Sequence, residues 1–178
     1  LPILKVAVLM LFIVTAFLSM WISNTATAAM MLPLAMGMMG HLDQEKERKT
    51  YVFVLLGIAY CASIGGLGTV VGSPPNMIAA KALNLDFVGW MKLGLPMMLL
   101  ILPLMLFSMY IILKPNLNER VEVKAESIPW TLHRVIALLI FLAAAIAWVF
   151  SSKIKAAFGI SNPDTVIALI AAVAVVVF

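Results

Sequence analysis

Polar residues interrupt the apolar pattern of this chain at a few short breaks, and the first break lies near the start. Two half-length apolar stretches, Val6 to Ile22 and Ala26 to Met39, flank the polar residues Ser23-Asn24-Thr25. Each is too short or too interrupted for an ordinary spanning helix, which needs about 20 apolar residues. A backbone break at membrane depth is tolerated only where it is buried in protein or lines a cavity. The pattern therefore predicts a re-entrant helical hairpin over residues 1–40 with Ser23-Asn24-Thr25 at its tip.

A second break follows a polar loop at residues 41–50. An apolar half helix, Tyr51 to Ser63, runs into a segment from Gly65 to Asn76 that contains four glycines and two prolines. Glycine and proline both disfavour a helix interior, so a continuous helix here is improbable. With a second half helix from Met77 to Leu83, residues 51–83 are predicted to form one broken transmembrane helix.

The remaining segments are simpler. Residues 84–113 contain an apolar run long enough to span, in which Pro96 and Pro103 are expected to produce kinks. Residues 114–130 form a polar connector. Residues 131–178 hold a further span, a polar turn from Ser151 to Asp164 and an apolar run that is too short to span by itself. We therefore expect the chain to be a piece of a longer, transporter-sized protein.

Composition fixes the class of protein. Of the 178 residues, 64% are hydrophobic and 11% are charged, whereas soluble domains contain about 25% charged residues. The chain is therefore predicted to be an all-α integral membrane protein in contact with the lipid bilayer. The formal net charge of +4 gives no reason to expect nucleic acid binding, because the basic residues lie between apolar segments. The single cysteine, Cys61, excludes a disulfide framework and is expected to be a packing residue.

The basic residues also predict the topology. The loop at residues 41–50 and the connector at 114–130 lie on one side if residues 51–83 cross the membrane once and 84–113 return. These two regions and the helix start that follows hold most of the basic residues: Lys46, Arg48, Lys49, Lys114, Arg120, Lys124 and Arg134. By the positive-inside rule that side is cytoplasmic.

The two breaks offer similar chemistry. A broken helix presents free carbonyl groups where its first half ends, here at residues 18–22, and free N–H groups where its second half begins, near residues 25–28. The helix macrodipole favours cations at the former and anions at the latter. Ser19, Ser23, Asn24 and Thr25 add neutral oxygen atoms and an amide. The stretch from Gly72 to Asn76 repeats this arrangement, with Asn76 able to cap or to bind.

Ionisable residues are absent from both breaks. The sequence contains no Asp, Glu, His, Lys or Arg between Val6 and Gly40 or between Tyr51 and Ala80. An alkali cation held by carbonyl and hydroxyl oxygens needs none, whereas a proton relay would. An anion would be met by N–H groups, amides and hydroxyls. The apolar segments also contain no nucleophile–base pair, which disfavours a membrane enzyme.

Two structural interpretations remain open beside binding. Ser23-Asn24-Thr25 is also a set of residue types that cap helices, so the tip is compatible with a plain turn. Gly68 and Gly72 form a GxxxG pair, which is compatible with close helix packing alone.

Longer motifs around the breaks resemble a known family. Residues 19–27, Ser-Met-Trp-Ile-Ser-Asn-Thr-Ala-Thr, are followed by Met31-Leu32-Pro33, and Gly65-Gly66 leads through Thr69 to Gly72-Ser73-Pro74-Pro75-Asn76. This combination strongly resembles the divalent anion/sodium symporter family, which transports succinate, citrate and related anions. The resemblance is strong from about Leu11 to Pro115 and looser beyond.

The resemblance implies a fold and a set of site residues. The fold would be part of an inverted-repeat, elevator-type transporter, with the hairpin and broken helix of the first repeat and the start of the second repeat from residue 131. Sodium would be bound by Ser19, Ser23, Asn24 and Gly72, largely through backbone oxygens. The substrate carboxylate would be bound by Asn24 and Thr25, with Ser73 and Pro74 nearby.

The resemblance also implies a function. We expect sodium-coupled symport of C4-dicarboxylates such as succinate, malate and fumarate, or of citrate, by a homodimer in the inner (plasma) membrane. Two alternatives remain: a sodium-independent dicarboxylate exchanger, and a related permease for arsenite, sulfate or citrate.

Overall fold

The computed structural model describes residues 4–119, 131–159 and 162–177, and every regular element in these ranges is an α-helix. Two described helices, α5 (Phe87–Leu113) and α6 (Leu132–Val149), are long and apolar enough to cross a membrane. The number of such segments rises to three if the bent pair of helices at the C-terminal end counts as one. The prediction of an all-α membrane protein is therefore confirmed for the described residues. The expected boundaries between domains remain predictions.

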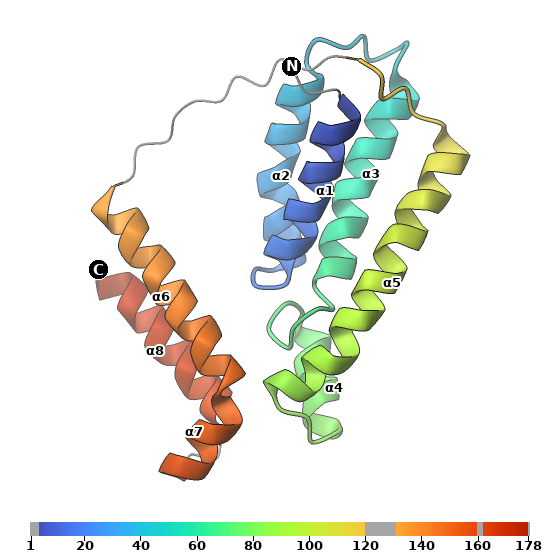
Figure 1. The fold of residues 1–178 in the computed structure, drawn as a ribbon. Helices are drawn as coiled ribbons and strands as arrows, with labels where there is room; N and C mark the ends of the chain where they lie inside the picture. The colour runs from blue at the N-terminus through green and yellow to red at the C-terminus, as the bar shows by residue number, and fades with distance from the viewer. Residues whose placement is uncertain (1–3, 120–130, 160–161, 178) are drawn as a thin grey trace.

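The hairpin consists of α1 (Leu4–Ser19) and α2 (Asn24–Met39), which run antiparallel and are joined by four residues (Figure 1). The break forms because Ser23 adopts a non-helical conformation and its hydroxyl accepts the N–H of Ala26, which starts a new helix. The helix–turn–helix that the pattern predicts is confirmed.

The broken helix consists of α3 (Arg48–Gly65) and α4 (Pro74–Ala82). The irregular segment between them begins after Gly65, where the glycines cluster, and ends where Pro74 and Pro75 supply the first turn of α4. α3 starts three residues earlier than the predicted half helix.

A single apolar core holds the hairpin against α3. The Phe12 side chain lies so close to Gly57 that a methyl group there would come within 2.2 Å of the ring, and Gly65 is equally close to the Ala16 backbone. Phe12 also packs edge-on against Phe53. The hairpin tip is therefore fixed in register beside the end of α3. The buried cluster comprises Leu4, Val8, Leu11, Phe12, Ala16, Met31, Ala35, Met38, Met39, Tyr51, Phe53, Val54, Ile58, Cys61, Met109 and Leu117.

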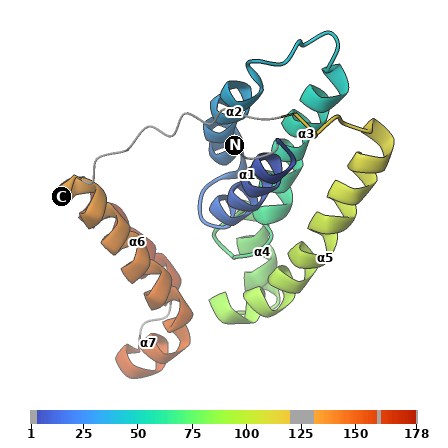
Figure 2. The ribbon, with the colours of Figure 1, turned by 45° about the horizontal axis from the view of Figure 1, so that its top comes forward.

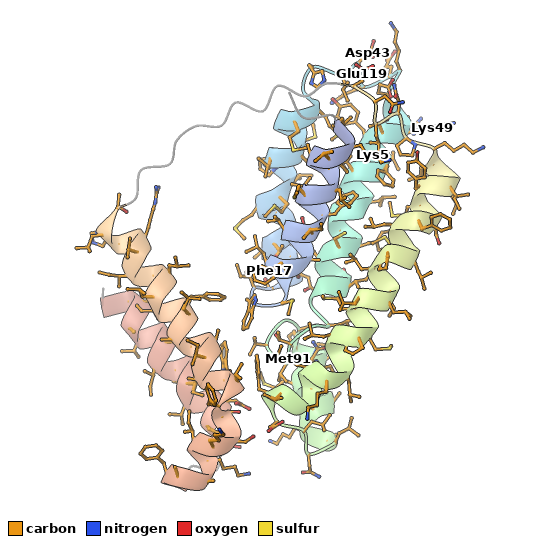
Figure 3. The ribbon with its side chains drawn as sticks, viewed as in Figure 1. Lys5, Phe17, Asp43, Lys49, Met91 and Glu119 are labelled. Carbon is orange, nitrogen blue, oxygen red and sulfur yellow. The ribbon has the colours of Figure 1, made fainter. Side chains whose placement is uncertain are left out.

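The polar end of this bundle lies opposite the hairpin tip. Lys5, Asp43, Lys49 and Glu119 lie there together (Figure 3). The N–H of Leu4 donates to the Glu119 carbonyl at 2.8 Å, and Asn116 of the connector bonds to Thr50 in the first turn of α3 and to Glu47 at the end of the α2–α3 loop. This loop and the start of the connector lie at the same end of the bundle, and their placement on the cytoplasmic side of a membrane stays a prediction; Arg120 and Lys124 lie outside the described residues.

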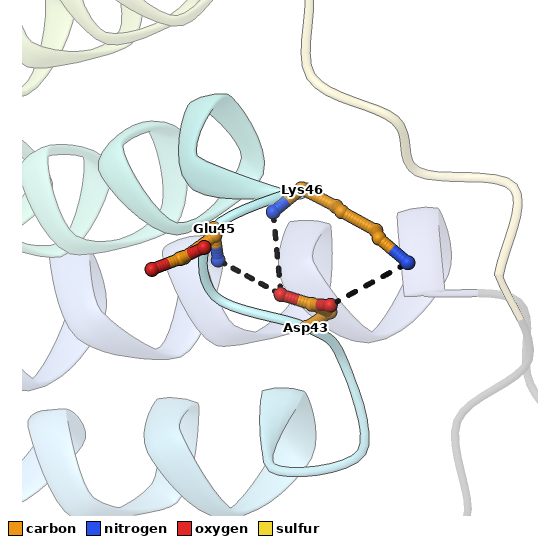
Figure 4. A network of polar contacts seen from close by, with 3 residues as sticks. All are labelled: Asp43, Glu45 and Lys46. Atoms are coloured by element: carbon orange, nitrogen blue, oxygen red, sulfur yellow. Dashed lines mark hydrogen bonds and ion pairs between the residues drawn. The ribbon is translucent and has the colours of Figure 1, made fainter.

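The loop between α2 and α3 is folded by Asp43. Its carboxylate accepts the backbone N–H groups of Glu45 and Lys46, and the Lys46 ammonium lies 3.7 Å away (Figure 4). Both charged side chains are well exposed, so the ion pair contributes little stability.

The C-terminal helices α6, α7 (Ser151–Phe158) and α8 (Pro163–Val177) form a second group beside the first bundle (Figure 1, Figure 2). The predicted polar turn from Ser151 to Asp164 is wrong over its first half, because α7 is helical. α7 is amphipathic: Ile154 and Phe158, one helical turn apart, line an apolar groove of about 500 Å³ against α6 and α8. Gly159, with a φ of +66°, ends the helix.

Candidate ion and substrate site at two helix breaks

Both breaks lie at the same level of the first bundle, where four helix ends meet. The C-terminal ends of α1 and α3 approach the N-terminal ends of α2 and α4 (Figure 1). Side chains bond across the breaks: the Ser19 hydroxyl donates to the Ala62 carbonyl at 2.6 Å, and the Thr69 hydroxyl donates to the Met20 carbonyl at 2.5 Å. The hairpin tip and the glycine-rich segment therefore form one site.

Ser19 and Asn24 form the first part of this site. The Ser19 side chain is completely buried, and its Oγ lies 2.8 Å from the Oδ1 of Asn24. The Ser19 hydroxyl has one proton for two acceptors, the Ala62 carbonyl and Asn24. If that proton is donated to Ala62, no proton is left between the Ser19 Oγ and the Asn24 Oδ1. The contact becomes favourable if the amide is turned so that its nitrogen donates, or if one cation is bound by both oxygens.

Gly66 makes room for the Asn24 amide. A methyl group at Gly66 would lie 2.3 Å from the Asn24 Oδ1, which is closer than real side-chain carbons approach. Asn24 is thus packed directly against the backbone of the second break.

Three carbonyl oxygens converge beside Gly72. A methyl group built on Gly72 would lie 2.5 Å from the Gly66 oxygen and 3.0 Å from the oxygens of both Met20 and Ser19. We call these three oxygens the carbonyl cage. That methyl position is bonded to the Gly72 Cα and cannot itself hold an ion, but it shows that three carbonyl oxygens, the ligand type that hard cations prefer, lie close together here. Any side chain at position 72 would force these oxygens to move.

The surroundings of the carbonyl cage fit a sodium ion. Two helix C-terminal ends direct the negative ends of their dipoles toward it. Within the described ranges, no group of three or more His, Cys, Asp or Glu side chains could hold a metal ion. The donors available here are neutral oxygens, which suit an alkali cation better than a transition metal.

Two buried side chains, those of Thr69 and Asn76, hold the backbone of the two breaks in this geometry. The sequence motifs did not predict this role for either residue. Thr69 is fully buried; its Oγ1 donates to the Met20 carbonyl and accepts the Gly72 N–H at 3.1 Å. Asn76 is 3% exposed and donates to the carbonyls of Gly66 and Thr69 at 2.7 and 2.8 Å. Asn76 is thus a brace for the loop; the N-cap of α4 is Ser73. A hydroxyl and an amide inside a glycine-rich break were the signals available.

The predicted site residues separate into two sets. Ser19, Asn24 and Gly72 come together at the carbonyl cage. Four others lie at the N-terminal ends of α2 and α4: Ser23 caps α2, Thr25 is exposed in its first turn, and Ser73 and Pro74 begin α4. Among the described contacts none joins this second set across the two breaks. Whether any of these residues binds sodium or substrate remains a prediction.

The two structural interpretations are each correct in part. Ser23 is indeed a helix cap. Glycine also permits close packing, since methyl groups at Gly68 and Gly94 would collide with Met20 and with the Leu67 carbonyl. Neither interpretation accounts for the buried polar contacts of Ser19, Asn24 and Thr69.

The chain is similar to known transporters over nearly its whole length. The CitMHS family, described as citrate transporters, matches residues 4–178. An uncharacterized transporter of Haemophilus influenzae is 52% identical over 97% of this chain and 39% of its own length. An uncharacterized transporter of Methanocaldococcus jannaschii is 36% identical over 98% of this chain and 39% of its length.

A third relative is named for its activity. The sodium-dependent dicarboxylate transporter SdcS of Staphylococcus saprophyticus is 29% identical over 77% of this chain and 31% of its own length. The chain therefore spans about two fifths or less of these relatives. They are transporters, in agreement with the prediction that the chain is not an enzyme. The sequence, with its match over nearly the whole length, belongs to the CitMHS family of citrate transporters.

Proposed function

We propose that this chain forms part of a secondary active transporter that couples sodium to the uptake of C4-dicarboxylates or citrate. The observation that carries the proposal is the carbonyl cage, in which backbone oxygens from both helix breaks, those of Ser19, Met20 and Gly66, lie close together beside Gly72. The cage contains no carboxylate, so it would take a cation without a proton exchange. That chemistry favours sodium over a proton as the coupling ion.

The anion would bind on the other side of the same breaks. The first turn of α2 offers N–H groups, and the macrodipole favours negative charge there. The N-terminal end of α4 contributes only its dipole, because Pro74 and Pro75 have no N–H and the Asn76 N–H donates to the Ser73 carbonyl at 3.1 Å. Thr25 is exposed and Ser73 half-buried at these ends, and Asn24, the first residue of α2, contacts Ser19 and Gly66. A carboxylate there would be near the bound cation, which would balance part of its charge. Asn24 would then contact both ligands, which couples their binding.

The relatives support this choice of ligands. The family is described as citrate transporters, and SdcS is named a sodium-dependent dicarboxylate transporter. The sodium-independent exchanger and the permease for arsenite, sulfate or citrate are the competing functions. Unlike the symporter, an exchanger would need no sodium. It would instead need an exchangeable anion on the opposite side of the membrane.

The transport movement is proposed to be an elevator. The hairpin, α3 and α5 share one buried cluster, whereas α6–α8 touch this bundle mainly through aromatic rings. Movement of the first bundle as a rigid body would keep the unpaired backbone groups of the breaks away from lipid. The family resemblance supports a homodimer in the inner (plasma) membrane.

The test is uptake by the full-length transporter in proteoliposomes. Labelled succinate and citrate are supplied with sodium, lithium or choline outside. We expect uptake that rises with sodium and falls to background in choline. Equal uptake in choline, with acceleration by internal dicarboxylate, would replace the symporter with the exchanger.

A further inference from the structure

Within the proposed sodium-coupled function, we infer that Thr69 and Asn76 are positioning residues that hold the carbonyl cage at one size and so set its preference for sodium over lithium. Neither side chain is a ligand in this proposal. Each acts by fixing a backbone carbonyl of the cage.

Thr69 joins the two breaks through a single hydroxyl. The Met20 carbonyl can only accept and the Gly72 N–H can only donate, so the Thr69 proton must point at Met20. The same hydroxyl thereby fixes the hairpin carbonyl of residue 20 and the backbone of residue 72, which are far apart in sequence. No other arrangement of this proton satisfies both groups.

Asn76 holds the backbone of the second break through its side-chain amide. Its Nδ2 carries two protons, and both are used on carbonyl groups, those of Gly66 and Thr69. Because both partners are acceptors, the orientation of the amide is determined by its contacts. Asn76 therefore fixes the Gly66 oxygen of the carbonyl cage and, through the Thr69 backbone, the residue that holds Met20.

The third oxygen of the cage is held differently. Among the hydrogen bonds of the described residues, none ends on the Ser19 carbonyl, which lies at the end of α1. Ser19 is anchored instead by its side chain on Ala62. Two of the three oxygens thus depend on side chains from the glycine-rich segment, whose backbone has little stiffness of its own.

A cage of fixed size discriminates between cations. Lithium is smaller than sodium and needs its oxygens closer together, so a rigid cage penalises lithium and a loosened cage does not. Selectivity from cavity size and from the number of oxygen dipoles are both known for ion sites. Loss of a positioning side chain should therefore weaken sodium binding and reduce the sodium-to-lithium preference together.

The experiment compares Thr69→Val with Thr69→Ser in the full-length transporter. Valine keeps the shape and removes the hydroxyl, whereas serine keeps the hydroxyl. Thr15→Val is the matched control: Thr15 is also fully buried, and its hydroxyl donates to the Leu11 carbonyl within α1, away from the breaks. Asn76→Leu tests the second brace, because it keeps a similar size, removes both donors and adds no charge beside the cage.

Two readouts are measured for each variant. The first is the sodium or lithium concentration that gives half-maximal succinate uptake in proteoliposomes. The second is the sodium-dependent rise in the melting temperature of the purified protein, which reports binding without transport. For Thr69→Val and Asn76→Leu we expect about a tenfold rise in the half-maximal sodium concentration, equivalent to about 1.4 kcal/mol, and a smaller sodium-to-lithium preference. Thr69→Ser and Thr15→Val should match the wild type.

The outcomes separate this inference from the function on which it rests. If the wild type shows no sodium dependence in either readout, the proposed function fails and the inference fails with it. If the wild type depends on sodium but Thr69→Val and Asn76→Leu keep its half-maximal concentration and ion preference, only the inference is overturned. If Thr69→Val does not fold, Thr69→Cys replaces it, because a thiol is a weaker hydrogen-bond donor than a hydroxyl. A sodium affinity of Thr69→Cys equal to that of the wild type would also overturn the inference.

Discussion

The two helical groups of this chain have similar apolar surfaces and different interiors. In the first group, α1–α5, two buried apolar clusters occur together with buried polar side chains such as Ser19, Thr69 and Asn76. In the second group, α6–α8, few side chains are buried; Ala144 is the buried residue of α6. Apolar packing tolerates many arrangements, whereas a buried hydrogen bond has one geometry and is costly to leave unmade. The buried polar contacts therefore specify the first group, and the second has fewer such constraints.

The two groups meet through aromatic rings at the hairpin tip. Trp21 lies 5.3 Å from Phe141 and 6.4 Å from Trp148, and Trp148 stacks on Phe87 at 5.7 Å. Trp21 follows directly after the carbonyl of Met20 in the chain. The two groups can come together and separate through this contact, because aromatic rings that part leave no hydrogen-bonding group without a partner.

The largest effect is expected from Gly72→Ala, because it disturbs the carbonyl cage that distinguishes the first group. The added methyl group would collide with the Gly66 oxygen at 2.5 Å and press on the oxygens of Met20 and Ser19 at 3.0 Å, and none of these backbone atoms can turn aside as a side chain could. Transport should fall by more than about 100-fold, because several kcal/mol of strain or displacement far exceeds the 1.4 kcal/mol of a tenfold change. Uptake at matched expression measures this, with Gly37→Ala as control, since a methyl there meets nothing within 4 Å. Normal uptake would exclude the carbonyl cage as a site.

The next effect distinguishes Asn24 from its neighbour Ser23. Asn24→Ala should abolish transport with little loss of folded protein, because the side chain contacts Ser19 and Gly66 across the breaks. Ser23→Ala should cost only about 1 kcal/mol of helix capping, in keeping with its 3.3 Å bond to the Ala26 N–H. The pair is compared by uptake and by size-exclusion profile. Equal activity in the two variants would mean that the tip is no more than a capped turn.

Much of this first group could be predicted from the sequence, because polar and glycine-rich breaks in an apolar chain are strong local signals. Ser23-Asn24-Thr25 and the segment from Gly65 to Asn76 gave both breaks to within a few residues. The bond from Thr69 to Met20 was not predictable, because it joins positions 49 residues apart and depends on how the hairpin packs. The α7 helix was missed because its serines and lysines are typical of a turn, and its apolar face appears only with α6 and α8 in place.

A smaller effect should follow from loosening the contact between the two groups. Trp148→Ala removes ring contacts with Trp21 and Phe87, each worth about 0.5–1.5 kcal/mol. Spin labels at the exposed positions Met36 and Leu139 should then show a broader distance distribution, with sodium affinity unchanged.

The control for this variant is Phe158→Ala, which removes a ring that is 76% exposed. A distance distribution that stays as narrow as in the wild type would mean that the aromatic contact does not hold the groups together.

The smallest effect concerns Asp86, which caps α5 and accepts the hydroxyl of Ser152 on α7. The Ser152 hydroxyl, followed by the Gly89 N–H, lowers the pKa of Asp86 below its ordinary value of 3.8. A lowered pKa in the folded state means that the stabilisation is present above the unfolded pKa and is lost as the pH falls through the folded pKa.

Asp86→Asn should therefore lower the melting temperature by at most about 2 °C, since exposed contacts of this kind contribute about 0–1 kcal/mol. The difference from the wild type should be the same at pH 7 and pH 5 and should shrink in acid below the lowered pKa. Melting curves at these pH values measure it, and a difference that grows in acid would contradict the assignment.

The most direct test of the central claim is equilibrium binding of radioactive sodium to the purified full-length transporter. The carbonyl cage predicts saturable binding to the wild type, loss of that binding in Gly72→Ala, and retention of it in Gly37→Ala. Saturable sodium binding of equal affinity in wild type and Gly72→Ala would contradict the assignment of the cation site to the two helix breaks.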